Sequence, residues 1–180
     1  NPGDEVLVDD GTYQENLLIE KDIILRSENG ADNTIIDGSL GRGLGSTVVI
    51  RPESLNPHKP IVEIDGFSII EGSTGITVST RPVDILNCVI HSNNCAGMYI
   101  SGSSSSNISN NEIYSNGGVG CGSPGAGIRM VNGSVVTASN NTIYNNTARL
   151  GNTGGDGGGA GNRHFAYGHY ASRAQRVARG

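Results

Sequence analysis

Few side chains in the central part of this 180-residue chain could carry out acid–base chemistry. Residues 73–160 contain three acidic and three basic residues in a stretch rich in Ser, Asn and Gly. Arg129 could neutralise a carboxylate and so acidify a neighbouring C–H, and Tyr99 or His91 could accept the proton. These are the two functions that β-elimination on a uronate requires. The repeated segments that carry Tyr99 and Arg129 contain no acidic residue to bind calcium, which needs several oxygen ligands.

Other classes of site lack the residues that they need. Three cysteines, Cys88, Cys95 and Cys121, form no CxxC pair, so the sequence predicts neither a disulfide framework nor a zinc site. We expect Cys88 and Cys95 to be buried small residues and Cys121 to be a free thiol. The acidic residues near the start of the chain match no EF-hand loop. No cofactor is therefore predicted; calcium is the one ion left open, although no motif supports it.

Composition and charge narrow the possible partners. The net charge is −5, and residues 1–72 hold 14 acidic against 5 basic residues, so nucleic acid is not an expected partner. The apolar runs are three or four residues long, too short to insert into a membrane. Gly, at 28 residues, is about twice its usual share. Such a chain builds its core from Ile, Val and Leu, since it has no Trp.

Internal repeats predict the fold. One motif starts with Gly and alternates apolar with other residues, and its copies begin at Gly75, Gly97 and Gly127, with spacings of 22 and 30 residues. A second motif keeps step with it, in the segments 85–90, 108–113 and 138–143. Both belong to one unit of about 22 residues, and the last copy carries an insertion. One outward position of the first motif is occupied in its three copies by Thr77, Tyr99 and Arg129.

A unit of this length contains three strands that are too short to bury their apolar faces alone. Stacking successive units pairs each strand with its equivalent in the next coil. The sequence therefore predicts an all-β parallel solenoid of about five coils, spaced by roughly 4.8 Å. Residues 6–38 are expected to form an opening coil, and residues 48–50 to begin the second. Gly and Asn are expected in the turns, because they tolerate the left-handed conformation.

A polar ladder is expected where the second motif turns. Four residues occupy equivalent positions in successive copies: Phe67, Cys88, Asn111 and Asn141. The amide of each Asn should bond to the next coil, and Cys88 fits the row as a small buried residue.

The repeats resemble those of a known superfamily. The segments 3–8, 11–16 and 34–38, together with the Gly-Ile-x-Val and Ile-x-Asn-Asn-x-Ile-Tyr-x-Asn units, are similar to right-handed parallel β-helix proteins of the pectin-lyase-like superfamily. The resemblance covers about residues 3–160 and implies a right-handed helix. It leaves activity open, because that superfamily includes lyases, hydrolases, esterases, epimerases, adhesins and phage tailspikes. The paired acids expected of pectin methylesterases and polygalacturonases are missing from the matching coils.

The layout of that superfamily implies a binding groove along the Gly-Ile-x-Val strands. Its outward side chains would be Thr77, Tyr99 and Arg129, with His91 supplied by a flanking loop. Tyr can stack on a pyranose, and Arg can bind hydroxyls or carboxylates. We therefore expect an extracellular or cell-surface, monomeric domain that engages polysaccharide, with no complete active site in this stretch. If it is enzymatic, a lyase, hydrolase or epimerase-like activity is expected; the alternative is a non-catalytic structural or adhesive solenoid.

The end of the chain departs from the repeats. We place the β-helix domain at residues 1–160, as a whole solenoid or a fragment of a longer one. Residues 161–180 contain four Arg and no acidic residue. This basic segment is interpreted as an irregular or short-helical cap, a tail that binds an anionic surface, or an out-of-frame extension.

Overall fold

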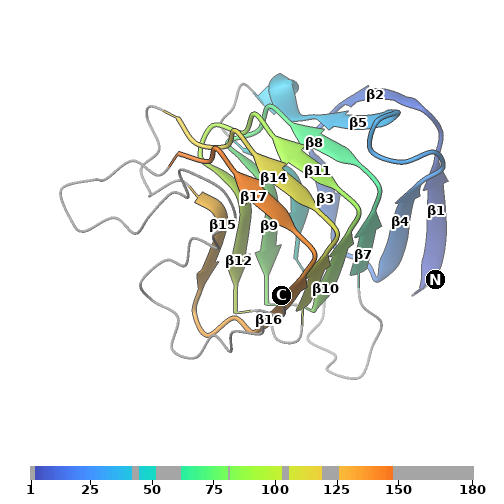
Figure 1. Cartoon of the computed structure of the whole chain (residues 1–180). Helices are drawn as coiled ribbons and strands as arrows, with labels where there is room; N and C mark the ends of the chain where they lie inside the picture. Colours follow the sequence, from blue (N-terminus) through green and yellow to red (C-terminus); the bar gives the residue numbers. More distant parts are fainter. Residues whose placement is uncertain are drawn as a thin grey trace.

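The computed structural model consists of parallel strands wound into a solenoid (Figure 1). It describes residues 3–41, 45–51, 62–80, 82–102, 106–118 and 126–147. The basic segment 161–180, and with it the predicted domain boundary at residue 160, lies outside the described residues. Within the described ranges, no helix is long and apolar enough to cross a membrane.

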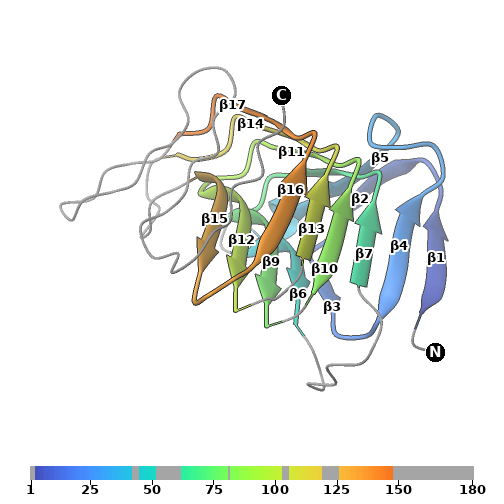
Figure 2. The same cartoon turned by 60° about the horizontal axis from the view of Figure 1, so that its bottom comes forward.

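The strands form three parallel sheets, which we call sheets A, B and C (Figure 2). Sheet A contains β1 (Asp4–Val8), β4 (Ile23–Ser27), β7 (Val62–Asp65), β10 (Val83–Leu86), β13 (Ser106–Ser109) and β16 (Val136–Ser139). Sheet B contains β2 (Gly11–Gln14), β5 (Thr34–Asp37), β8 (Ser68–Ile70), β11 (Val89–His91), β14 (Glu112–Tyr114) and β17 (Thr142–Tyr144). Sheet C contains β3 (Leu17–Ile19), β6 (Ser46–Ile50), β9 (Thr74–Ser79), β12 (Ala96–Ser101) and β15 (Ala126–Val131).

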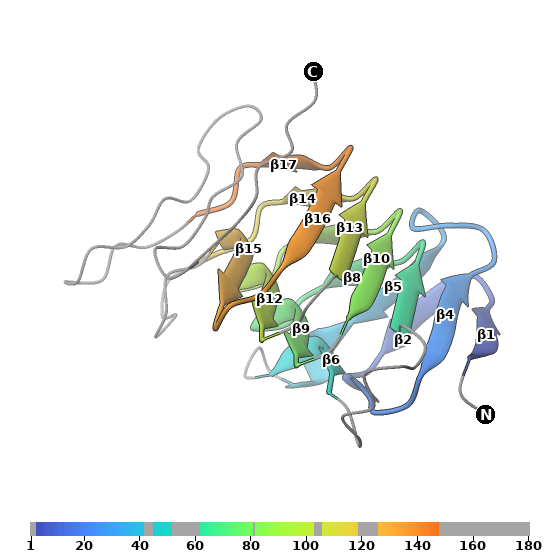
Figure 3. The same ribbon diagram turned by 90° about the horizontal axis from the view of Figure 1, so that it is seen from below.

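Each strand pairs with the strand three elements further along the chain, so three consecutive strands make one coil (Figure 3). The described residues form five complete coils and the first two strands of a sixth. The predicted right-handed parallel β-helix is confirmed. A single short 3-10 turn, η1 (Gly38–Gly41), precedes β6 within the described ranges.

The start of the chain differs from the predicted single opening coil. β4 pairs directly with β1, with Val6 opposite Leu25, so Ile23 begins a second coil. β6 then closes that second coil, because it pairs with β3 rather than starting a new row. The boundary between two coils is defined by which strands pair. The turns of this region are longer than those of the later repeats, so the repeat of about 22 residues is not visible in its sequence.

Alternation within the strands builds the core. Inward residues of successive coils stack in rows, because pairing is in register. In sheet B the row is Ile36, Ile69, Ile90, Ile113 and Ile143. All five side chains are buried. Residues with positive φ recur at the corners, including Asn87, Asn110 and Asn140. The expected use of Asn in left-handed turn positions is confirmed.

Candidate functional site

The outer face of sheet C brings three predicted site residues into one row. Tyr99 on β12 lies opposite Thr77 on β9 and opposite Arg129 on β15. In each strand the neighbouring residues point inward; Met98 and Ile100 on either side of Tyr99 are fully buried. The shared position in the repeat therefore becomes a row of adjacent, half-exposed side chains parallel to the solenoid axis.

Contacts within this row hold its side chains in place. The Arg129 guanidinium carbon lies 5.4 Å from the centroid of the Tyr99 ring, which is a cation–π distance. The hydroxyl oxygens of Thr77 and Ser46 lie 2.7 Å apart. Arg129 supplies a planar fork of donors, and Tyr99 and Thr77 supply hydroxyls. The row can therefore bind an anionic, hydroxyl-rich ligand.

The same face lacks the groups needed for a complete acid–base mechanism. Its five strands contain no Asp, Glu or His, so Tyr99 is the one ionisable group besides Arg129 on these strands. Nor do the described residues contain a group of three or more His, Cys, Asp or Glu that could hold a metal ion. Tyr99 is therefore the one candidate for proton transfer among the residues of these strands.

His91 does not join this row. It is the last residue of β11 in sheet B rather than part of a flanking loop, and it points outward there because Ile90 points into the core. Its ring stacks on Tyr114 with a centroid distance of 4.8 Å, and Tyr114 stacks on Tyr144 at 5.1 Å. Burial lowers the pKa of His91, while Glu71 and Glu112 oppose that shift. His91 thus lies at the end of a strand of sheet B and not in a loop flanking the row on sheet C.

The turn from sheet A to sheet B contains the ladder residues. The Cys88 backbone N–H donates to Asn111 Oδ1 (2.8 Å), and Asn111 Nδ2 donates to Asn141 Oδ1 (3.0 Å). Phe67 begins the row and is buried. Burial raises the pKa of the Cys88 thiol to about 12. These four residues thus join consecutive coils and leave no reactive group at the surface.

A second ladder, at the turn from sheet B to sheet C, was not predicted. Asn93 Nδ2 donates to Asn116 Oδ1 (3.0 Å), and Asn116 Nδ2 donates to Asn146 Oδ1 (2.9 Å). Each residue of this ladder lies five positions after the corresponding residue of the first ladder, and this spacing can be read from the sequence. The ladder packs under the start of sheet C: a Cβ on Gly97 would come within 2.7 Å of Ile113 and 3.0 Å of Asn116. Glycine at this position therefore lets the ladder and the sheet C strands approach closely.

The cysteines also differ from expectation. Cys88 is free and buried, as expected of a small core residue. Cys95, in contrast, is half-buried and disulfide-bonded. The prediction that Cys95 is merely a small buried residue was wrong, because spacing along the sequence says nothing about which cysteines the coils bring together. Cys121, predicted to be a free thiol, lies outside the described residues.

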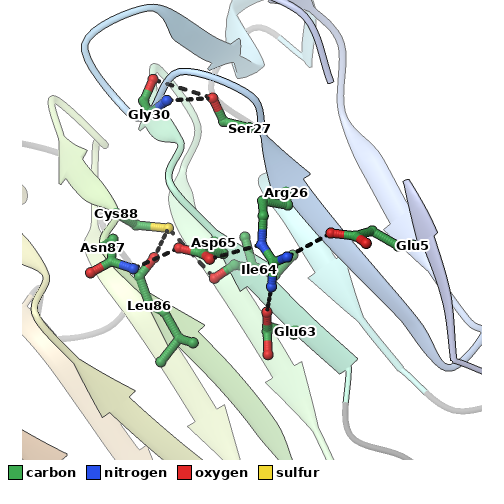
Figure 4. A network of polar contacts seen from close by, with 10 residues as sticks. All are labelled: Glu5, Arg26, Ser27, Gly30, Glu63, Ile64, Asp65, Leu86, Asn87 and Cys88. Carbon is green, nitrogen blue, oxygen red and sulfur yellow. Dashed lines mark hydrogen bonds and ion pairs between the residues drawn. The ribbon is translucent and has the colours of Figure 1, made fainter. Parts of the chain in front are cut away.

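Sheet A carries a charged network on its outer face (Figure 4). Arg26 lies between three carboxylates: its Nη1 is 2.6 Å from Glu5, its Nη2 is 2.7 Å from Glu63 and its Nε is 3.0 Å from Asp65. These contacts raise the pKa of Arg26. Burial, followed by the charge of Glu63, raises the pKa of Asp84 on the adjacent β10. The arginine thus ties three coils together and offsets part of an acidic face.

Comparison with solved structures supports this architecture through one viral protein. A search of curated proteins finds no match. Among solved structures, ORF18 of Geobacillus virus E2 is similar over 79% of this chain, with 19% identity and a TM-score of 0.57. Pectin methylesterase PemA from Erwinia chrysanthemi matches over 81% of the chain, with 11% identity and a TM-score of 0.35. The chain spans 31% of the viral structure and 44% of the pectin methylesterase.

A family model described as the right handed beta helix region matches residues 29–157. This match covers more than half of the chain and includes all strands from β5 to β17. The protein therefore belongs to the right-handed β-helix family, as the resemblance of its repeats to the pectin-lyase-like superfamily predicts.

Proposed function

We propose that this chain is an extracellular or cell-surface β-helix domain that binds an anionic polysaccharide along the outer face of sheet C. The observation that carries this proposal is the row of Thr77, Tyr99 and Arg129, held in register on three adjacent coils with Arg129 over the Tyr99 ring. A linear polymer lying parallel to the solenoid axis would meet these side chains one after another.

The chemistry of the row favours an acidic sugar. The guanidinium of Arg129 can form two parallel hydrogen bonds with a carboxylate, which are among the stronger polar contacts in proteins. The methylene groups of Arg129 and the aromatic ring of Tyr99 form an apolar surface beside the guanidinium charge. Hydroxyls of Thr77 and Ser46 can exchange hydrogen bonds with sugar hydroxyls. The combination suits a polymer that carries both hydroxyl and carboxylate groups.

The proposal is one of binding rather than catalysis. The strands of sheet C supply no carboxylate or imidazole for proton transfer. We therefore assign the domain a binding role within a larger carbohydrate-active protein. Its extracellular location is supported by the disulfide of Cys95, since structural disulfides persist in oxidising compartments.

A structural or adhesive solenoid is the second candidate function. It is favoured by the two ladders and by the His91–Tyr114–Tyr144 stack, in which polar and aromatic side chains join successive coils. A rigid spacer would need these contacts and no binding row.

Binding to a panel of neutral and acidic polysaccharides tests the proposal. We expect binding to polyuronates at low salt, and the loss of a charge-assisted pair in Arg129→Gln should weaken it about tenfold or more. Thr137→Ala, an exposed change on the outer face of sheet A, is the matched control and should leave binding unchanged. No unsaturated product should form during incubation. Equal binding by Arg129→Gln and the unaltered protein, or no binding to any acidic polymer, would leave the structural solenoid as the better account.

A further inference from the structure

The chain contains three Asn-Gly steps, and the structure places each of them in a different environment. They are Asn29–Gly30, Asn116–Gly117 and Asn132–Gly133. An asparagine followed by glycine can lose its side-chain amide without an enzyme. The backbone nitrogen of the glycine, which no Cβ shields, attacks the asparagine Cγ and closes a succinimide ring. Because this reaction needs an accessible nitrogen and a side chain free to turn toward it, the fold decides which step reacts.

Burial protects the step at Asn116. The Asn116 side chain is fully buried, and its Nδ2 donates to the Ile90 carbonyl oxygen and to Asn146 Oδ1. The backbone N–H of Gly117, which would supply the attacking nitrogen, donates to the Asn93 carbonyl oxygen at 2.8 Å. Both reacting groups are therefore held in the second ladder, away from water.

Hydrogen bonds protect the step at Asn29, although this residue is exposed. The backbone N–H of Gly30 donates to Ser27 Oγ at 2.9 Å. The Asn29 Nδ2 donates to Asp10 Oδ1 at 2.9 Å, and the Asn29 carbonyl oxygen accepts from Asn33 Nδ2 at 3.1 Å. The attacking nitrogen and the amide that would leave are thus both occupied.

The step at Asn132 lacks this protection. Asn132 and Gly133 follow β15 directly, are both exposed, and have φ values of 55° and 74°, a left-handed pair typical of Asn-Gly turns. A Cβ added to Gly133 would meet no atom within 4 Å. Within the described ranges, no hydrogen bond occupies the Gly133 N–H. The Asn132 amide is held by one contact, in which its Nδ2 donates to Ser101 Oγ at 2.8 Å.

We propose that Asn132 is a site of spontaneous deamidation, and that Ser101 restrains the reaction by holding the Asn132 amide. Base removes the proton of the Gly133 N–H, the nitrogen bonds to Asn132 Cγ, and the Cγ–Nδ2 bond breaks. The leaving nitrogen takes up a proton and departs as ammonia. Water then opens the succinimide at either carbonyl, which yields an aspartyl or an isoaspartyl residue. A neutral amide thereby becomes a carboxylate, and no oxidant or reductant is needed.

The new carboxylate would lie at the end of the strand that carries Arg129. Three residues along an extended strand correspond to about 10 Å. At this distance in water, a negative charge lowers the affinity for an anionic group by a factor of about two, and salt screens the effect. This consequence rests on the function proposed above, whereas the modification itself does not. The domain would therefore lose affinity for an acidic polymer as it ages.

The experiment incubates the full chain at neutral and at mildly alkaline pH. Digestion under mildly acidic conditions and mass spectrometry then follow each Asn-Gly peptide, with the aspartyl and isoaspartyl products separated by chromatography. Ser101→Ala removes the proposed restraint. Asn140 is the matched internal control, because it is also exposed with a φ of 54° but is followed by Asn141 instead of glycine. Circular dichroism verifies that each form retains its strands.

We expect the Asn132 peptide to convert to both products at least about tenfold faster than the Asn29 and Asn116 peptides, since those steps must first open locally. Conversion should be faster at alkaline pH. In Ser101→Ala it should rise a further two- to tenfold or about that, the effect of one lost hydrogen bond. Equal rates at the three steps, or conversion at Asn140 as fast as at Asn132, overturns the site. An unchanged rate in Ser101→Ala overturns the restraint.

Binding of a polygalacturonate oligosaccharide at low salt tests the consequence, with Asn132→Asp representing the aspartyl product. The dissociation constant should rise about twofold in Asn132→Asp and stay unchanged in Asn140→Asp, which adds the same charge at another corner of the solenoid. Equal binding by the two variants overturns the effect on affinity. If Asn132 deamidates and no form binds the oligosaccharide, the modification is supported and the proposed binding function fails.

Discussion

Replacing Asn116 by Ala should remove the central rung of the second asparagine ladder. Asn116 is fully buried between coils four and six. Its Nδ2 donates to the Ile90 carbonyl oxygen (2.9 Å) and to Asn146 Oδ1 (2.9 Å). Its Oδ1 accepts from the backbone N–H (3.2 Å) and the Nδ2 (3.0 Å) of Asn93. One side chain therefore makes four hydrogen bonds to two neighbouring coils.

The magnitude follows from what the truncation leaves behind. Asn93 Nδ2 retains the carbonyl oxygens of Ile69 and His91, and Asn146 Oδ1 retains the backbone N–H of Asn116. The backbone N–H of Asn93 loses the acceptor that Asn116 provides, and a buried donor left unsatisfied costs about 1–3 kcal/mol. Adding the net loss of the other bonds, the free energy of unfolding should fall by about 3 kcal/mol. For a chain of this size the melting temperature should fall by about 6–12 °C.

Urea unfolding followed by circular dichroism measures this change, with tyrosine fluorescence as a second probe because the chain has no Trp. Asn107→Ala is the matched control: the same residue type in the same coil, half-exposed on the outer face of sheet A. It should change the unfolding free energy by less than about 0.5 kcal/mol. The reasoning is refuted if Asn116→Ala is no more destabilising than Asn107→Ala, since the ladder would then contribute no more than a surface amide.

Two further predictions concern titration and reactivity. Because the pKa of Asp84 is raised, the native state binds its proton more tightly than the unfolded chain, and stability falls as pH rises above the ordinary carboxyl range. Asp84→Asn should therefore raise the melting temperature at pH 7 and not at pH 3, and an equal shift at both pH values would contradict this. Cys88, buried with a pKa of about 12, should resist a thiol reagent such as iodoacetamide in the native protein and react once urea unfolds it. Mass spectrometry reads out this labelling, and rapid native modification of Cys88 would show that its coil opens.

Much of the fold was readable from periodic positions in the sequence. The motif copies at Gly75, Gly97 and Gly127 predicted three equivalent strands, and β9, β12 and β15 follow them. Side chains alternate strictly between the two faces of a strand, so the outward positions of Thr77, Tyr99 and Arg129 followed from the same pattern. Their adjacency followed because parallel pairing in register puts equivalent residues side by side.

Features outside the strict repeat could not be predicted in this way. Each residue of the second ladder follows a residue of the first ladder by five positions, beginning with Asn93. This spacing indicates a ladder only when both turns are known to face the interior of the solenoid. The position of His91 at the end of a strand of sheet B could not be read in this way, because a residue near a strand end belongs to the sheet that its backbone pairing selects. The division of residues 4–50 into two coils was missed because the turns there are longer and less regular.

What the sequence determined by itself is the periodic architecture: parallel strands, an Ile- and Val-rich core, asparagine turns and one outward row. These features depend on the alternation of apolar and polar residues within a strand and on the stacking of similar units. Both appear in the sequence as regular spacings of residue types. What the tertiary structure decided is which non-repeating residues meet. Arg26 reaches Glu5, Glu63 and Asp65 across three coils, and Cys95 forms a disulfide. The connections between these residues differ in length, so their spacing in the sequence does not show that they meet. The pairing of strands from successive coils brings them together.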